Sequence, residues 1–85
     1  MVAVKEIVYT RKFERDVRKL RDGPVKERLS RQIRKIAEDP EIGRPLRCGL
    51  KGEWTARIAP YRLIYAVQGD RLVLLRSERR KSAYG

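Results

Sequence analysis

The spacing of apolar residues changes near Glu53, and no other feature restricts the possible folds as strongly. Between Thr10 and Asp39, apolar residues recur every three or four positions, as they do on one face of a helix. From Glu53 onward, three segments rich in β-branched and aromatic residues are separated by Ala59-Pro60 and Gly69-Asp70, which favour tight turns. We therefore expect helices followed by an antiparallel meander of three strands, with the sequences EWTARI (53–58), YRLIYAVQ (61–68) and RLVLLR (71–76).

Two helices are expected between Thr10 and Asp39. Thr10 suits an N-terminal cap. The turn Asp22-Gly23-Pro24 ends the first helix and begins the second, because glycine favours the position after a helix and proline the first turn of one. Asp39-Pro40 ends the second helix. So short a connection predicts an antiparallel helix hairpin, whose apolar residues are Phe13, Val17 and Leu20 in the first helix and Val25, Leu29, Ile33 and Ile36 in the second.

The remaining segments complete the expected fold. Residues 2–9 are rich in β-branched side chains and predict an N-terminal strand, whereas residues 40–52 predict a loop. The fold class is then α+β, in the order β-α-α-β-β-β with a short basic tail. At this length we expect residues 1–85 to form a single domain.

The charge of the chain points to an acidic partner. Lys and Arg number 22 against 11 Asp and Glu, a formal charge of +11 spread along the sequence. Self-repulsion of this size favours a polyanionic partner, nucleic acid first and an acidic protein second. No apolar run approaches a membrane span and the start lacks a signal-peptide core, so we expect a cytoplasmic protein with no membrane contact. A single cysteine and the absence of histidine exclude an internal disulfide and the usual zinc sites.

A two-residue turn at Ala59-Pro60 places Arg57 directly opposite Arg62, because cross-strand partners in a hairpin have a constant index sum. Like charges placed opposite one another destabilise a sheet, and guanidinium groups grip phosphate oxygens well, so the pair is a candidate phosphate site. Two exposed arginines without a function, or a register one residue away, are the alternatives. The other face of the hairpin receives an apolar set suited to packing under the helices, namely Trp54, Ala56, Ile58, Tyr61, Leu63 and Tyr65.

The same constant index sum gives the cross-strand pairs of the second hairpin, which turns at Gly69-Asp70. It makes the centre of the sheet apolar on both faces, so something should cover the second face: a partner peptide, the protein's own tail or a second copy. It also puts a charged residue of the last strand on the apolar side, which predicts a bulge or a strand end nearby. The pairs are Tyr65 with Leu74, Ile64 with Leu75, and Leu63 with Arg76.

The tail after the last strand is basic and contains Tyr84. Basic residues bind a phosphate backbone without reading its sequence, and a tyrosine can stack on a base. A frayed basic terminus is the alternative.

These residues also form a wider pattern, made up of Pro45-Leu46, Leu50-Lys51-Gly52, Trp54, Arg57, the segment 61–65, and Arg80 four residues before Tyr84. The pattern resembles the RelE toxin family, of archaeal type, within the wider RelE/ParE group. The basic tail with Tyr84 favours the RelE branch over the ParE branch.

The resemblance implies the toxin of a type II toxin–antitoxin pair, which cuts messenger RNA in the ribosomal A site and is silenced by a cognate antitoxin. The implied reaction needs no metal or cofactor: the RNA 2′-hydroxyl attacks the adjacent phosphate and leaves a 2′,3′-cyclic phosphate and a free 5′-hydroxyl. Carried over by position, the resemblance implies catalytic roles for Arg57, Arg62, Arg80 and Tyr84, and contacts with RNA or the ribosome for Lys51, Arg76, Arg79 and Lys81.

The proton acceptor of this reaction is not identified, because Thr55 stands where some bacterial members have a lysine. Arginine stays protonated, so the candidates are Tyr84, Lys51, Lys81 and Glu78. Two alternatives to RNA cleavage remain. One is a ParE-like inhibitor of DNA gyrase, and the other is a non-catalytic module that binds RNA or the ribosome.

Overall fold

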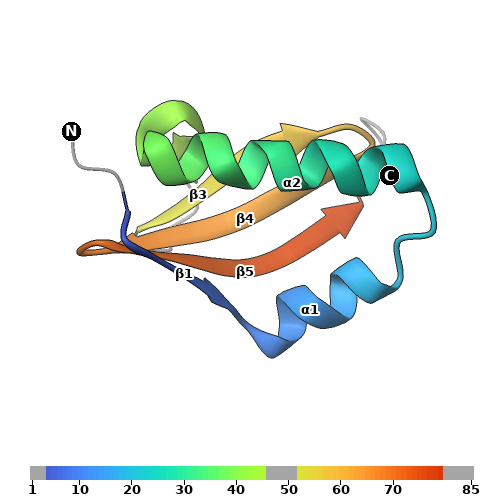
Figure 1. The fold of residues 1–85 in the computed structure, drawn as a ribbon, viewed down its shortest axis with the longest axis horizontal. Helices are drawn as coiled ribbons and strands as arrows, with labels where there is room; N and C mark the ends of the chain where they lie inside the picture. Colours follow the sequence, from blue (N-terminus) through green and yellow to red (C-terminus); the bar gives the residue numbers. More distant parts are fainter. Residues whose placement is uncertain (1–3, 46–51, 80–85) are drawn as a thin grey trace.

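A computed structural model describes residues 4–45 and 52–79, and within these residues the strands form one five-stranded sheet with helices on one face (Figure 1). The spatial order of the strands is β1-β5-β4-β3-β2. The α+β fold class predicted from the sequence is confirmed. The elements in chain order are β1 (Glu6–Tyr9), α1 (Arg11–Arg18), α2 (Gly23–Glu38), the 3₁₀ turn η1 (Pro40–Ile42), β2 (Arg44–Pro45), β3 (Glu53–Ile58), β4 (Tyr61–Gln68) and β5 (Arg71–Arg79).

The sheet is mixed. β3, β4 and β5 form the predicted antiparallel meander, and β1 runs parallel to β5 at one edge, with Tyr9 opposite Leu74. A parallel neighbour needs a crossover, and the helices and the meander together supply it. Residues 40–45 differ from the expected loop, because η1 and β2 lie there and β2 pairs with β3.

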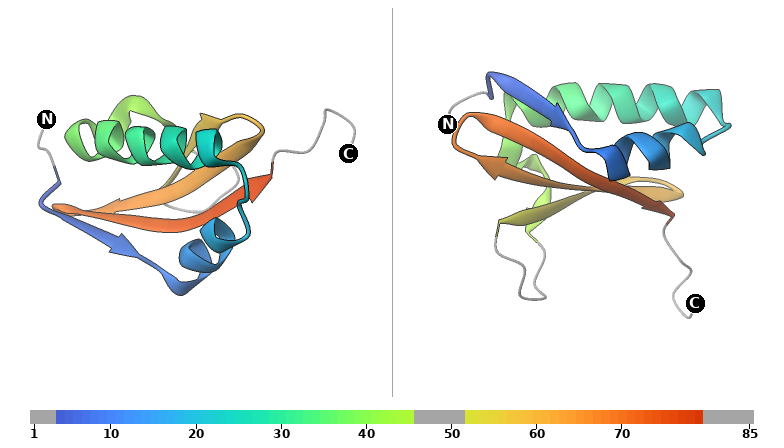
Figure 2. Two further views of the ribbon diagram at one scale, coloured as in Figure 1. Left: turned by 45° about the vertical axis from the view of Figure 1, so that its right-hand side comes forward. Right: turned by 90° about the horizontal axis from the view of Figure 1, so that it is seen from below.

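The helices cover one face of the sheet and complete its core. Figure 2 shows α2 lying across this face, and α1 beside the end of β5. The predicted N-terminal cap is present, because the Thr10 hydroxyl accepts from the Phe13 N–H at 3.2 Å. The structure adds a second cap, in which the Asp22 carboxylate accepts from the Val25 N–H at 3.2 Å. The core contains Phe13, Leu20, Val25, Leu29, Ile33, Ile36, Ala56, Ile58, Leu63, Tyr65, Leu72 and Leu74.

The predicted helix boundary at Gly23 is wrong. α1 already ends at Arg18, and Gly23 is the first residue of α2 rather than the cap of α1. The physical reason is Asp22, whose side chain caps the second helix and so keeps residues 19–22 as the connection. Within the described residues, neither helix is long and apolar enough to cross a membrane.

The last two strands contain the predicted irregularity. Tyr65 is opposite Leu74 as expected, but Ile64 is opposite Arg76, because Leu75 is an extra residue at a β-bulge. The predicted pairing of Ile64 with Leu75 is therefore wrong, and so is that of Leu63 with Arg76, since Leu63 is opposite Ser77. A regular ladder would have turned the Arg76 guanidinium toward the core, where an unpaired charge costs several kcal/mol.

Candidate functional site

The face of the sheet turned away from the helices, called here the outer face, carries the arginine pair. Arg57 of β3 and Arg62 of β4 are cross-strand partners, as the turn predicted. Both side chains are exposed, whereas Ala56 and Leu63 beside them are buried on the helix side. The alternation of a β-strand therefore places both arginine side chains on the solvent side of the sheet.

A cleft of about 470 Å³ opens beside this pair. Arg44, Arg57 and Arg62 line it among the described residues, and they come from β2, β3 and β4. Thr55 also lines it, at the position where some RelE members have a lysine. Three guanidinium groups around one cleft suit an anion with several oxygens, such as a phosphodiester. Arg44 was missed in the sequence because a strand of two residues has no alternation to detect.

Carboxylates of the outer face pair with its arginines. Arg62 Nη2 lies 3.3 Å from Glu78 Oε1, and Glu78 Oε2 lies 3.7 Å from Arg76 Nε. Arg76 Nη2 then lies 3.6 Å from Glu53 Oε1, which is buried and accepts no hydrogen bond from the described residues. Charges therefore alternate across the sheet from Arg62 to Glu53, and Arg57 contacts no carboxylate of the described residues.

The structure brings some of the predicted site residues together and separates one. Arg57, Arg62 and Arg76 share the outer face. Arg79 is opposite Tyr61, whose side chain packs against the core, so it belongs to the helix side of the sheet. Among the proton-acceptor candidates, Glu78 is described, and it contacts Arg62. The other predicted site residues, Lys51, Arg80, Lys81 and Tyr84, lie outside the described residues.

Tyr65 has a structural role on the other side of the sheet. Its side chain is buried, and its hydroxyl donates to the Pro40 carbonyl at 2.7 Å. Burial raises the pKa of this phenol, a hydrogen bond from the Gly43 backbone opposes part of the rise, and the negative charge of Asp39 adds a smaller increase. A neutral, buried tyrosine fixes η1 against the sheet and thereby places β2 and Arg44 at the cleft.

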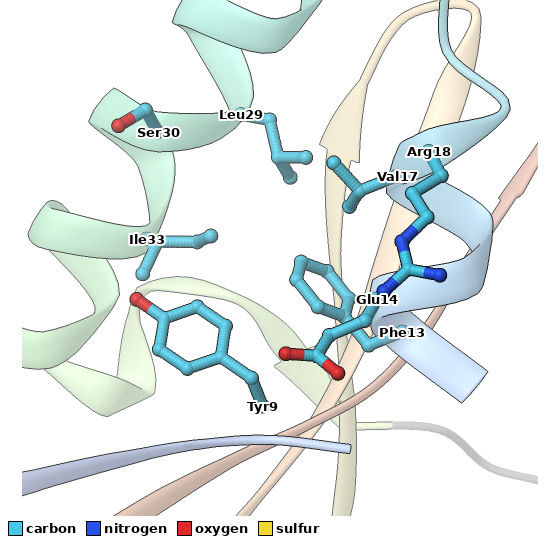
Figure 3. Close-up of a pocket in the computed structure, with 8 residues that line it drawn as sticks. All are labelled: Tyr9, Phe13, Glu14, Val17, Arg18, Leu29, Ser30 and Ile33. Atoms are coloured by element: carbon cyan, nitrogen blue, oxygen red, sulfur yellow. The ribbon is translucent and has the colours of Figure 1, made fainter. Parts of the chain in front are cut away.

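A second hollow, of about 360 Å³, lies between α1 and α2 (Figure 3). Apolar side chains from the two helices face one another in it, and the Tyr9 ring lies at the end of β1 beside it. Tyr9 is 51 % exposed, the most exposed large apolar side chain of the described residues. This helix groove is lined by Tyr9, Phe13, Glu14, Val17, Arg18, Leu29, Ser30 and Ile33.

Comparison with solved structures identifies the same fold in bacterial toxins. The toxin–antitoxin complex RelBE2 of Mycobacterium tuberculosis has a chain 28 % identical to this one, with a TM-score of 0.77, covering 93 % of this chain and 100 % of that one. The YoeB/ParE toxin of Agrobacterium tumefaciens is 25 % identical, with a TM-score of 0.75 and coverage of 89 % and 99 %. Escherichia coli toxin RelE, solved with an antitoxin peptide, shares the fold at 21 % identity, with a TM-score of 0.76 and coverage of 99 % and 90 %.

Sequence comparison agrees with this. A search of curated protein sequences gives no match. A family model described as the ParE toxin of the type II toxin–antitoxin system parDE matches residues 7–84, which is nearly the whole chain. The resemblance to the RelE/ParE group, drawn from the residues of the hairpin and tail, is confirmed. The chain belongs to the ParE toxin family of type II toxin–antitoxin systems, within the RelE/ParE superfamily.

Proposed function

We propose that this toxin is a ribosome-dependent endoribonuclease that acts in the cytoplasm and cuts messenger RNA in the ribosomal A site. The arrangement of Arg44, Arg57 and Arg62 around one cleft supports this proposal best. Inhibition of a protein target requires a complementary surface, but it does not require guanidinium groups from three strands around a site of this size. A phosphodiester with developing negative charge does benefit from them.

The proposed reaction is a transfer of a phosphoryl group within the RNA. The 2′-oxygen forms a bond to the adjacent phosphorus while the bond from phosphorus to the 5′-oxygen breaks. The 2′-hydroxyl gives up its proton, and the 5′-oxygen gains one. Arg57 and Arg62 stabilise the charge on the nonbridging oxygens, and the reaction needs no metal or cofactor. One fixed donor of this kind is typically worth about 10²- to 10³-fold in rate.

The identity of the proton acceptor stays a prediction. Thr55, at the cleft, has a hydroxyl that is far too weak a base for this task. Glu78 contacts Arg62 and would act only after exchanging that contact for the 2′-hydroxyl. Lys51, Lys81 and Tyr84 remain candidates for the base. The resemblance also implies a catalytic role for Arg80, and contacts with RNA or the ribosome for Arg76 and Arg79.

The partner that silences the toxin is a cognate antitoxin. The M. tuberculosis and E. coli relatives were solved with antitoxins. The helix groove is the proposed binding site of the antitoxin, because it is apolar inside and bordered by charged side chains from α1. The outer face is less suitable than the sequence suggested, since the bulge puts Arg76 rather than Leu75 beside Ile64.

Inhibition of DNA gyrase is the second candidate function, and the observation that favours it is the ParE family model. The two candidates differ in what they leave intact. A gyrase inhibitor blocks supercoiling and leaves messenger RNA intact. The proposed endoribonuclease cuts messenger RNA and leaves supercoiling unaffected.

The test adds the purified toxin to a translating extract and maps the 5′ ends of the messenger RNA. We expect codon-phased cuts whose rate falls about 10²- to 10³-fold in Arg62→Ala, because one donor to the phosphate is lost. Arg34→Ala is the control, since it removes one exposed positive charge from α2, away from the outer face. It should leave the cuts in place.

Three results would argue against the proposal. Intact messenger RNA with blocked gyrase supercoiling favours the ParE-like function. Intact messenger RNA with ribosome binding favours a non-catalytic module. Equal losses in Arg62→Ala and Arg34→Ala would show that net charge, and not the arginine site, controls cleavage.

A further inference from the structure

The contact between Arg62 and Glu78 depends on the β-bulge in β5. Residues of β5 after the bulge have moved by one position relative to β4, and this turns Arg76 and Glu78 onto the outer face. If the ladder were regular, Ser77 would lie opposite Arg62 and Glu78 opposite Tyr61, on the helix side. The carboxylate beside Arg62 would then be absent from that face.

Thr10 and helix α1 hold this bulge at the edge of β5. β1 ends at Tyr9, opposite Leu74, so the strand that pairs with this edge of β5 stops where the bulge begins. Beyond the end of β1, the Thr10 hydroxyl donates to the Leu74 carbonyl at 2.7 Å and to the Leu75 carbonyl at 3.1 Å. The Asp16 carboxylate, at 2.9 Å, accepts the backbone N–H of Ser77.

Asp16 is a charged residue that is buried in this arrangement. Its carboxylate is 8 % exposed, and a buried carboxylate is unfavourable unless its hydrogen bonds are satisfied. Oδ2 accepts from Ser77, and Oδ1 accepts from Lys12 Nζ at 2.7 Å. The Lys12 side chain is largely exposed, so the contact with Ser77 is the one that ties Asp16 to the sheet.

We propose that Asp16, together with Thr10, is a positioning residue for the arginine site. These residues hold the backbone of β5 from Leu74 to Ser77 in the bulged register. The register keeps Glu78 against Arg62, and Glu78 holds the Arg62 guanidinium at the cleft. The role in cleavage rests on the proposed function, whereas the coupling of Asp16 to Arg62 does not.

The test follows the Arg62 Nε–H resonance by NMR in the purified toxin and the kinetics of RNA cleavage on ribosomes. In Asp16→Ala we expect the Arg62 resonance to move toward its position in Glu78→Gln, and the Ser77 amide to exchange faster than the Leu72 amide. We expect kcat to fall about 10- to 100-fold, because a displacement of about 1 Å is enough for such a loss. KM should change less than about threefold, since the phosphate-binding arginines are still present.

Two control variants separate positioning from general stability. Asp16→Asn keeps an oxygen that accepts from Ser77 and should restore both the resonance and kcat. Lys12→Ala removes the ion pair of Asp16 without touching Ser77 and should behave like the wild type. Should Asp16→Ala not fold, the same comparison applies to Thr10→Val and its conservative partner Thr10→Ser, which keeps the hydroxyl.

An unchanged Arg62 resonance in a folded Asp16→Ala protein would overturn the proposal, and so would an Asp16→Asn protein as impaired as Asp16→Ala. If the wild type cleaves no RNA but the Arg62 resonance moves as expected, the positioning role stands and the proposed function fails.

Discussion

Gly43 is required at the cleft because of space and not because of its backbone conformation. Its φ of −79° is open to any residue. A Cβ atom built there would lie 2.7 Å from the Thr55 carbonyl oxygen and would also collide with the Tyr65 hydroxyl. The carbonyl belongs to the backbone of β3, so it cannot move without moving the strand that carries Arg57.

We expect Gly43→Ala to lower the free energy of unfolding by about 1–3 kcal/mol, as overpacking of a tight site does. Urea denaturation measures this loss. Gly23→Ala is the matched control, because nothing lies within 4 Å of a Cβ there. At the start of α2, alanine should be neutral or stabilising by up to about 1 kcal/mol. Equal destabilisation of both variants would contradict the steric explanation.

Tyr65 makes stability depend on pH in the alkaline range. Because its pKa in the folded protein is raised above the ordinary value of 10.0, the unfolded chain loses the phenol proton first as pH rises. The stabilisation is complete below pH 10 and is lost as pH rises toward the folded-state pKa. We expect the difference in unfolding free energy between the wild type and Tyr65→Phe, measured in urea, to narrow above about pH 10. A constant difference from pH 8 to 11 would contradict this assignment.

At the scale of elements, the helix groove gives a prediction about the antitoxin. Tyr9→Lys places a charge at the apolar groove, and we expect it to weaken antitoxin binding at least tenfold, since an exposed aromatic anchor is lost. Titration calorimetry with the antitoxin measures the affinity. Ile42→Lys is the control for antitoxin binding alone, because Ile42 is 43 % exposed and lines the arginine cleft instead of the groove. RNA cleavage by free Tyr9→Lys should persist. Equal weakening by both lysines would place the antitoxin elsewhere.

The elements also show which parts of this fold could be predicted from sequence. The Ala59-Pro60 turn predicted the pairing of Arg57 with Arg62, because a tight hairpin fixes its register locally. The bulge at Leu75 was expected only as an irregularity near Arg76. Its position depends on Thr10 and Asp16, whose hydrogen bonds to β5 join residues 64 and 61 positions apart in the chain and follow no local pattern.

In the candidate site, too, local contacts could be predicted from the sequence and contacts between remote residues could not. Arg57 and Arg62 follow from one hairpin, whereas Arg44 enters the cleft through a two-residue strand whose partner is remote in sequence. Glu78 was considered only as a base, because its contact with Arg62 depends on the shifted register.

At the scale of the whole molecule, the charge of +11 predicted a polyanionic partner but not its place of contact. The sheet brings Arg44, Arg57 and Arg62 together around one cleft, which is the proposed place of contact. Glu78 and Glu53 neutralise part of the charge of Arg62 and Arg76. Arg44 and Arg57, which have no carboxylate contact among the described residues, are therefore the stronger attraction for phosphate at the cleft.

The strand order also sets a sequence of events during synthesis. β1 is made first, yet its neighbour in the sheet is β5, which is made last among the strands described here. A nascent chain that has not reached Arg71 lacks the partner of its first strand and the carboxylate that contacts Arg62. The sheet can therefore close only after β5 has been made. Until then, a nascent toxin carries the arginines of the cleft on a sheet that still lacks β5 and its carboxylates.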